Sequence, residues 1–128
     1  MRRVVVTGMG IISSIGNNLL EVTKSLRNLK SGISSNEINK EMGLRSHVSG
    51  NIKDLQLDEL IDRKIYRFMG DAAAYAYLSS LEALEDSKLP ADKISNNRTG
   101  LIMGSGGASS KDQIDSADLL RSKGVKKL

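Results

Sequence analysis

Few residues of this chain could support acid–base or covalent chemistry. Its 128 residues include no cysteine, which excludes disulfides, thiolate metal ligands and a cysteine nucleophile among them. The single histidine, His47, follows Arg45 in a polar stretch and has no second ligand at a fixed spacing, so a structural role is favoured. Serines are present, but none lies in a Gly-x-Ser-x-Gly elbow. The sequence therefore disfavours serine hydrolysis, and it predicts no metal site and no cofactor.

Basic residues form a more informative pattern. Arg63 and Arg67 are four positions apart and Lys64 and Arg67 three apart, so a helix would place them on one face. Like charges at these spacings cost a helix roughly 0.2–0.5 kcal/mol per pair, which a partner bearing carboxylates or phosphates would remove. A second basic group follows near the end of the sequence: Arg121, Lys123, Lys126 and Lys127.

The net charge of +4 agrees with an acidic partner, although a solvated basic face explains the pattern equally well. Nucleic acid is a weaker candidate, because aromatic residues make up only 3% of the chain and no recognition module is visible. The short apolar run at the N-terminus cannot cross a membrane. We therefore expect a cytoplasmic protein that binds neither nucleic acid nor membrane.

Two glycine-rich loops resemble parts of a dinucleotide fingerprint. They are Gly8-Met9-Gly10-Ile11-Ile12-Ser13 and Gly104-Ser105-Gly106-Gly107-Ala108-Ser109. Each has the first two glycines of Gly-x-Gly-x-x-Gly, but serine occupies the third position. Tight turns with close backbone packing are favoured over phosphate-binding loops, and a nucleotide-binding α/β domain stays open as an alternative.

Local patterns predict the elements that carry these residues. Val4–Val6 and Thr99–Met103 are typical of strands buried on both faces, as in a parallel sheet. Asn17 or Asn18 begins a helix whose apolar face includes Leu19, Val22, Leu26 and Leu29, and Ser109 or Ser110 begins another. Residues 33–58 are predicted to be loop with short extended pieces.

The long helical pattern from Leu60 has a possible break at Gly70, and Pro90 ends it. Within this pattern, Ala72, Ala76 and Ala83 form a small face suited to close packing. The order of strands and helices predicts a parallel α/β sheet within one domain of residues 1–128. Two buried strands leave apolar, unpaired edges, so we expect the chain to associate or to be part of something larger.

Four blocks of sequence resemble the β-ketoacyl-acyl-carrier-protein synthases, and three of them resemble the type I bacterial branch in particular. The blocks, in chain order, are RVVVTGMGIISSIGN (residues 3–17), LRSHVSGN (44–51), IDRKIYRFM (61–69) and RTGLIMGSGG (98–107). Their order and spacing are compatible with the family over nearly the whole chain, which makes the resemblance far more specific than either glycine-rich loop.

The resemblance implies a thiolase-like fold, of which this chain is the N-terminal portion of the first βαβ core, with an incomplete parallel sheet and helices. It also implies a homodimeric full-length enzyme of fatty acid elongation that performs a decarboxylating Claisen condensation. In that family a cysteine takes the acyl group and two histidines assist decarboxylation, and all three lie beyond the position matching Leu128. His47 matches neither histidine, so we expect this chain alone to be inactive.

Recognition residues can be carried over from the resemblance. Positions matching Arg63, Lys64 and Arg67 receive the acidic helix of acyl carrier protein, assisted by positions matching Arg45, Lys123, Lys126 and Lys127. Gly107 matches a position that lines the acyl pocket. The alternative is a catalytically dead module that binds the carrier protein.

Overall fold

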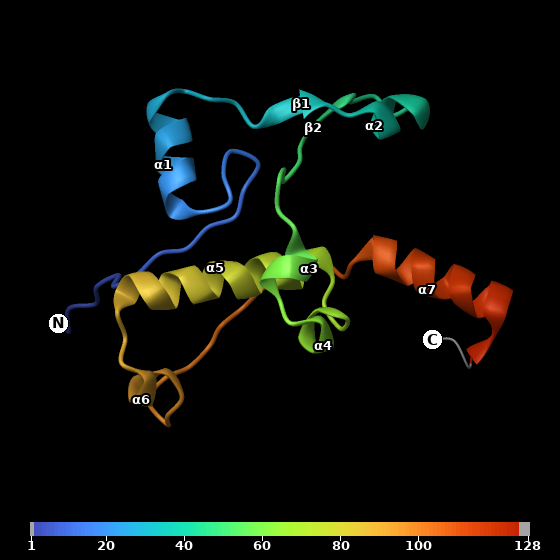
Figure 1. The fold of residues 1–128 in the computed structure, drawn as a ribbon. Helices are drawn as coiled ribbons and strands as arrows, with labels where there is room; N and C mark the ends of the chain where they lie inside the picture. The colour runs from blue at the N-terminus through green and yellow to red at the C-terminus, as the bar shows by residue number, and fades with distance from the viewer. Residues whose placement is uncertain (1, 126–128) are drawn as a thin grey trace.

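The computed structural model describes residues 2–125, in which helices predominate (Figure 1). The elements in chain order are α1 (Leu19–Arg27), β1 (Ile33–Ser35), α2 (Glu37–Glu41), β2 (Val48–Gly50), α3 (Leu57–Leu60), α4 (Arg63–Tyr66), α5 (Asp71–Ser87), α6 (Ala91–Ile94) and α7 (Ser110–Lys123). In Figure 1, α5 runs through the middle, an arm with β1, β2 and α2 extends to one side, and α7 leads away from one end of α5.

The helix starts follow from their capping residues. The side chain of Asn18 accepts a hydrogen bond from the backbone N–H of Glu21 at 2.9 Å, and the carboxylate of Glu21 accepts one from the N–H of Asn17 at 2.8 Å. Ser109 caps α7 through the N–H of Asp112, and Gly70 is the N-cap of α5. These starts confirm the predicted helices. Leu29, expected on the face of the first helix, lies beyond its end and has a φ of 54°.

The N-terminal loop crosses α5 at very short range. A Cβ atom added to Gly8 or to Gly10 would collide with the carbonyl oxygens of Ala83 and Ser79, respectively. Only glycine permits this approach, so the first glycine-rich loop is a close-packing segment, as favoured from the sequence. Asp86 accepts a hydrogen bond from the N–H of Met9 at 2.9 Å, which fastens the same loop to α5.

The two-stranded sheet lies in the arm and is antiparallel. Its register pairs Ile33 with Gly50, Ser34 with Ser49 and Ser35 with Val48. These strands are the short extended pieces expected within residues 33–58, but the loop prediction for the rest of that range is wrong at α2 and at the start of α3, which are helical. A small core of Leu57, Ile61 and Ala74 joins α3 and α5.

The structure corrects the two predicted buried strands. Within residues 2–125, Val4–Val6 and Thr99–Met103 are extended but belong to no sheet. Val4 is 94% exposed and Ile102 97% exposed, so neither segment is buried. A β-rich sequence forms a strand only where another strand satisfies its backbone groups, and the described chain supplies none at these places. The expected parallel sheet is therefore not formed among these residues.

Candidate functional site

The helical turn α4 displays the basic residues singled out from the sequence. The carboxylate of Asp62 caps it by accepting a hydrogen bond from the N–H of Lys64 at 2.7 Å. Ile61 just before it is 3% exposed, and Tyr66 packs against the core cluster of Leu57, Ile61 and Ala74. This apolar anchoring fixes the orientation of the turn and leaves its charged side chains in solvent.

The cations of α4 are exposed and uncompensated. Arg63, Lys64 and Arg67 are all exposed, and none has a carboxylate within 4.0 Å among residues 2–125. The guanidinium of Arg67 lies 4.4 Å from the ring centroid of Phe68, a cation–π contact, and Phe68 is itself 77% exposed. We call Arg63, Lys64, Arg67 and Phe68 the α4 patch. It presents three positive charges beside an aromatic ring, a combination suited to an acidic surface with an apolar centre.

The remaining predicted basic residues do not join the α4 patch. Arg45 is exposed in the segment between α2 and β2, and Figure 1 shows these two elements in the arm, away from α4. Lys123 is the last residue of α7, at the end of that helix farther from α5 (Figure 1). Lys126 and Lys127 lie outside the described residues. Arg121 pairs with Asp118 at 3.2 Å, so that charge is partly compensated.

Gly107 lines a hollow of about 550 Å³ between α5 and the start of α7. One wall is the small face of α5, with Ala72, Ala73 and Ala76, and the other is the second glycine-rich loop. No heavy atom lies within 4 Å of where a Gly107 side chain would begin. Alanine and glycine add little side-chain bulk to these walls, and Met103 and Asp112 are the largest side chains that line the hollow.

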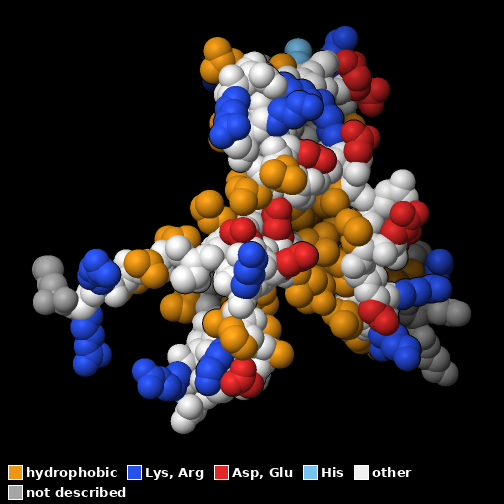
Figure 2. Space-filling model, turned by 60° about the vertical axis from the view of Figure 1, so that its left-hand side comes forward, with side chains coloured by type: hydrophobic (Ala, Val, Ile, Leu, Met, Phe, Trp, Pro, Cys, Tyr) orange, Lys and Arg blue, Asp and Glu red, His pale blue; other side chains and the backbone are white. Residues whose placement is uncertain are grey.

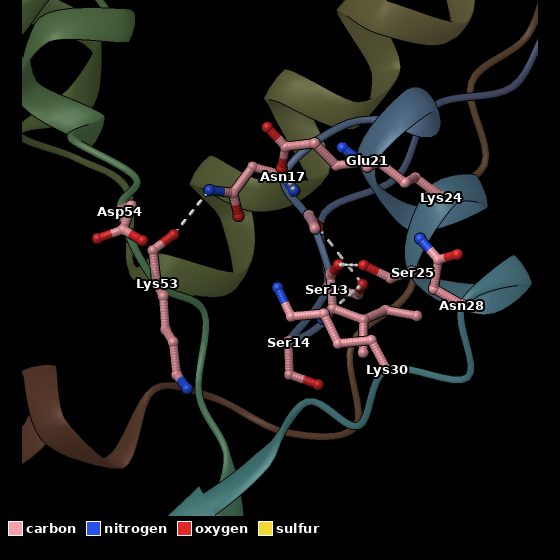
Figure 3. Close-up of a pocket in the computed structure, with 12 residues that line it drawn as sticks. Ser13, Ser14, Asn17, Glu21, Lys24, Ser25, Asn28, Lys30, Lys53 and Asp54 are labelled. Atoms are coloured by element: carbon pink, nitrogen blue, oxygen red, sulfur yellow. Dashed lines mark hydrogen bonds between the residues drawn. The ribbon is translucent and has the colours of Figure 1, made fainter.

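A second, polar hollow of about 380 Å³ lies between residues 13–17, α1 and Lys53–Asp54 (Figure 3). Its hydrogen bonds close the chain on itself: Asn17 donates to the carbonyl of Lys53 at 2.7 Å, and Ser25 donates to the carbonyl of Ile15 at 2.6 Å. No histidine lines it, and the hydroxyl of Ser13 donates to the carbonyl of Gly16 at 3.4 Å. These hydrogen bonds hold residues 13–17 in place against α1 and the segment at Lys53.

No catalytic constellation is assembled in the described part of the chain. His47 is exposed, and its carbonyl accepts a hydrogen bond from the N–H of Asn36 in the arm. No group of three or more His, Asp or Glu residues among residues 2–125 could hold a metal ion. In the same range, no helix has the length and apolar character needed to cross a bilayer.

Two residues of structural or recognition interest were not singled out from the sequence. Phe68 is the only phenylalanine of the chain. Its position directly after Arg67 could have indicated an aromatic ring beside the basic residues. Glu82 accepts hydrogen bonds from backbone groups of two distant segments, Ile11 and Leu19. Nothing in the local sequence reveals such long-range contacts.

Comparison with known proteins assigns the sequence to one family. The model of the β-ketoacyl synthase N-terminal domain matches residues 1–127. A 3-oxoacyl-[acyl-carrier-protein] synthase 1 of Haemophilus influenzae is 57% identical over 127 residues, which are 98% of this chain and 31% of the relative. The synthase 1 of Escherichia coli K12 is 52% identical over 122 residues, 94% of this chain and 30% of the relative.

A relative of lower sequence identity is also a 3-oxoacyl-[acyl-carrier-protein] synthase. The 3-oxoacyl-[acyl-carrier-protein] synthase 2 of Vibrio harveyi is 34% identical over 105 residues, which are 82% of this chain and 25% of the relative. The chain thus spans at most about a third of the length of these curated relatives.

Proposed function

Because the chain belongs to the β-ketoacyl synthase family, we propose that residues 1–128 act as the N-terminal portion of a 3-oxoacyl-acyl-carrier-protein synthase. Such an enzyme joins an acyl group to malonyl-carrier protein with loss of carbon dioxide, which lengthens a fatty acid. In that enzyme, these residues would dock the carrier protein and line part of the acyl-binding site. A thiolase-like fold, a homodimer and a cytoplasmic location belong to the same proposal.

The α4 patch is the single observation that carries the docking role. Its three cations are exposed and unpaired among the described residues, and Asp62, the nearest acid in sequence, is engaged by a backbone N–H. An acidic helix of a carrier protein would relieve their mutual repulsion, and Phe68 would cover an apolar part of the same surface. Arg45, Lys123, Lys126 and Lys127 would act as secondary contacts that steer the approach.

The hollow beside Gly107 would receive acyl carbons. Its walls are mostly small residues, with Met103 and Asp112 as the larger ones, and the open space at Gly107 would set how much chain can enter. In this family the condensation uses a cysteine nucleophile and two histidines, whereas this chain has no cysteine and a single, exposed histidine. The chain by itself would therefore bind the carrier protein without catalysing the condensation.

A titration with acyl carrier protein at low and at physiological salt tests the docking role. Micromolar binding that weakens as salt rises is expected, because the contacting charges are exposed and are screened beyond a Debye length of about 8–10 Å. Charge reversal of Arg63 and Arg67 to Glu should abolish it. A control for a single charge reversal is Lys93→Glu on α6, at a residue paired with Asp92; its effect is compared with that of Arg63→Glu alone.

Equal binding by the Arg63→Glu/Arg67→Glu variant and the wild type would overturn the docking role. Condensing activity of the isolated chain would contradict its inactivity.

For the nucleotide-binding alternative, Gly8 and Gly10 are unsuitable, because they pack against α5 and leave no open cradle for a phosphate. The second glycine-rich loop is open, since no atom lies within 4 Å of a Cβ added at Gly104, Gly106 or Gly107. Binding of NAD(P) or ATP to the chain would revive that alternative.

A further inference from the structure

Phe68 is an aromatic side chain held at the surface within the α4 patch. It is 77% exposed, although a phenylalanine ring is among the side chains that gain most from burial. Figure 2 shows hydrophobic side chains gathered in the middle of one face of the molecule, with Lys and Arg side chains distributed around them. At Phe68 the two kinds of side chain meet, because the guanidinium carbon of Arg67 lies 4.4 Å from the centroid of its ring. The ring thus contributes to the surface rather than to the core.

The backbone fixes the place of both residues. The N–H of Phe68 donates to the carbonyl of Ile65 at 3.1 Å, which continues the turn beyond the last residue of α4. Tyr66 and Met69 flank the pair, and both pack against the core cluster that joins α3 and α5. Because the chain is anchored on both sides, only rotations of the two side chains can separate the guanidinium of Arg67 from the ring of Phe68.

The ring restrains Arg67 and leaves its hydrogen-bonding groups free. A guanidinium over an aromatic face is attracted by the negative charge of that face, and its N–H groups can still reach a carboxylate. No carboxylate of residues 2–125 lies within 4.0 Å of Arg67, whereas Arg121 on α7 donates to Asp118 at 3.2 Å. Arg67 is therefore held in place and still has its charge available to another molecule.

The other two cations of the α4 patch have no such support. Within the described residues, no aromatic ring lies beneath the charged group of Arg63 or of Lys64. A free Lys or Arg side chain loses rotamer freedom when a partner immobilises it, and this loss weakens binding. Because Arg67 is already restrained, we expect it to lose less freedom on docking than its two neighbours.

We propose that Phe68 is a positioning residue of the α4 patch, whose ring holds the guanidinium of Arg67 where it receives a carboxylate of an acidic protein surface. The proposal rests on the proposed function, which supplies the acyl carrier protein as that partner. It adds a requirement that the proposed function does not contain: residue 68 must be aromatic, and an aliphatic side chain of similar size does not suffice.

The contact between the two side chains is tested without any carrier protein. Protons that lie over an aromatic ring resonate upfield, so the Hδ and Hε protons of Arg67 should resonate upfield of those of Arg63. In Phe68→Leu they should move into the range of Arg63, and in Phe68→Tyr they should stay upfield because the ring is kept. Equal shifts of Arg67 in Phe68→Leu and in the wild type would overturn the proposal.

A double-mutant cycle tests the effect on docking. Phe68→Leu keeps an apolar side chain and should weaken carrier-protein binding about two- to fivefold, which corresponds to the loss of one exposed cation–π contact. In an Arg67→Gln background the same substitution should have no further effect, because no guanidinium is left to hold. Arg63→Gln is the matched control background, since it also removes one charge of the patch. There, Phe68→Leu should weaken binding by its full factor.

The outcomes separate this proposal from the proposed function. An equal effect of Phe68→Leu in all three backgrounds would overturn the proposal, because the ring would then act by touching the carrier protein directly. Wild-type affinity in Phe68→Leu would overturn it too. Failure of the wild-type chain itself to bind the carrier protein would refute the proposed function and this proposal together. Both residues are exposed, so the variants should fold, which circular dichroism verifies.

Discussion

Glu82 on α5 accepts a hydrogen bond from the backbone N–H of Ile11 at 2.9 Å, across 71 positions of sequence. Its other carboxylate oxygen accepts from the N–H of Leu19, the first residue of α1, at 2.7 Å. One side chain therefore fixes both the N-terminal loop and the helix that follows it. These contacts hold the N-terminal loop on α5 although no strand pairs with it.

Replacement of Glu82 by alanine should destabilise the chain by about 1–3 kcal/mol, because two part-buried N–H groups lose their acceptor. Urea unfolding followed by circular dichroism measures the loss. Glu85→Ala on the same helix is the control, since Glu85 is exposed, and should change stability by less than about 0.5 kcal/mol. Equal effects of the two substitutions would refute the anchoring role of Glu82.

Gly10→Ala should also destabilise the chain, by about 1–3 kcal/mol, because the added methyl group collides with the carbonyl oxygen of Ser79. Thermal unfolding detects the change. Gly106→Ala provides a matched control in the second glycine-rich loop, where no atom lies within 4 Å of the added group. A Gly10→Ala variant as stable as Gly106→Ala would mean that the loop does not pack on α5.

Alkaline pH should weaken the fold partly through Tyr75. Burial first, then the negative charge of Asp71 and the neighbouring Tyr66, raise the pKa of Tyr75 above its usual 10.0. The unfolded chain then loses this proton at lower pH than the folded chain. The stabilisation is full below about pH 10 and is lost as the pH rises through the folded pKa.

The comparison of Tyr75→Phe with the wild type checks this pH dependence. Urea midpoints measured from pH 8 to pH 11 should fall less steeply above pH 10 for the variant. Parallel curves for the two proteins would show that the pKa of Tyr75 does not differ between the folded and unfolded states.

Gly107→Ile should leave the stability of this chain within about 0.5 kcal/mol, because the position is open. In a complete synthase carrying the same substitution, we expect a shift towards shorter acyl products, since the side chain would fill the hollow. Product chain lengths resolved by mass spectrometry measure it. Gly106→Ile is the control, as Gly106 does not line the hollow, and an unchanged product profile in Gly107→Ile would exclude this acyl-pocket role.

Helices with strong end signals could be predicted from the sequence. Asn18 and Ser109 cap α1 and α7 as expected, and Gly70 separates α4 from α5. The signals at Asn18 and Ser109 are local, because each capping side chain accepts a hydrogen bond from an N–H only three residues later. The basic turn was found for the same reason, since Arg63 and Arg67 are one helical turn apart.

The predicted strands failed because pairing is not a local property. Val4–Val6 and Thr99–Met103 have the composition of buried strands, and only a neighbouring strand could make them so. The contacts of Glu82 could not be predicted from local sequence either, since they join segments more than 60 positions apart. Arg45 was grouped with Arg63 by resemblance, while the fold places it in the arm.

The most direct test of the account is a titration of the isotopically labelled chain with unlabelled acyl carrier protein, followed by amide chemical shifts. Shift changes concentrated at Arg63, Lys64, Arg67 and Phe68, and reduced by added salt, are the result that the account predicts. No shift change at α4, or changes confined to the polar hollow around Ser13 and Lys53, would contradict the carrier-docking role.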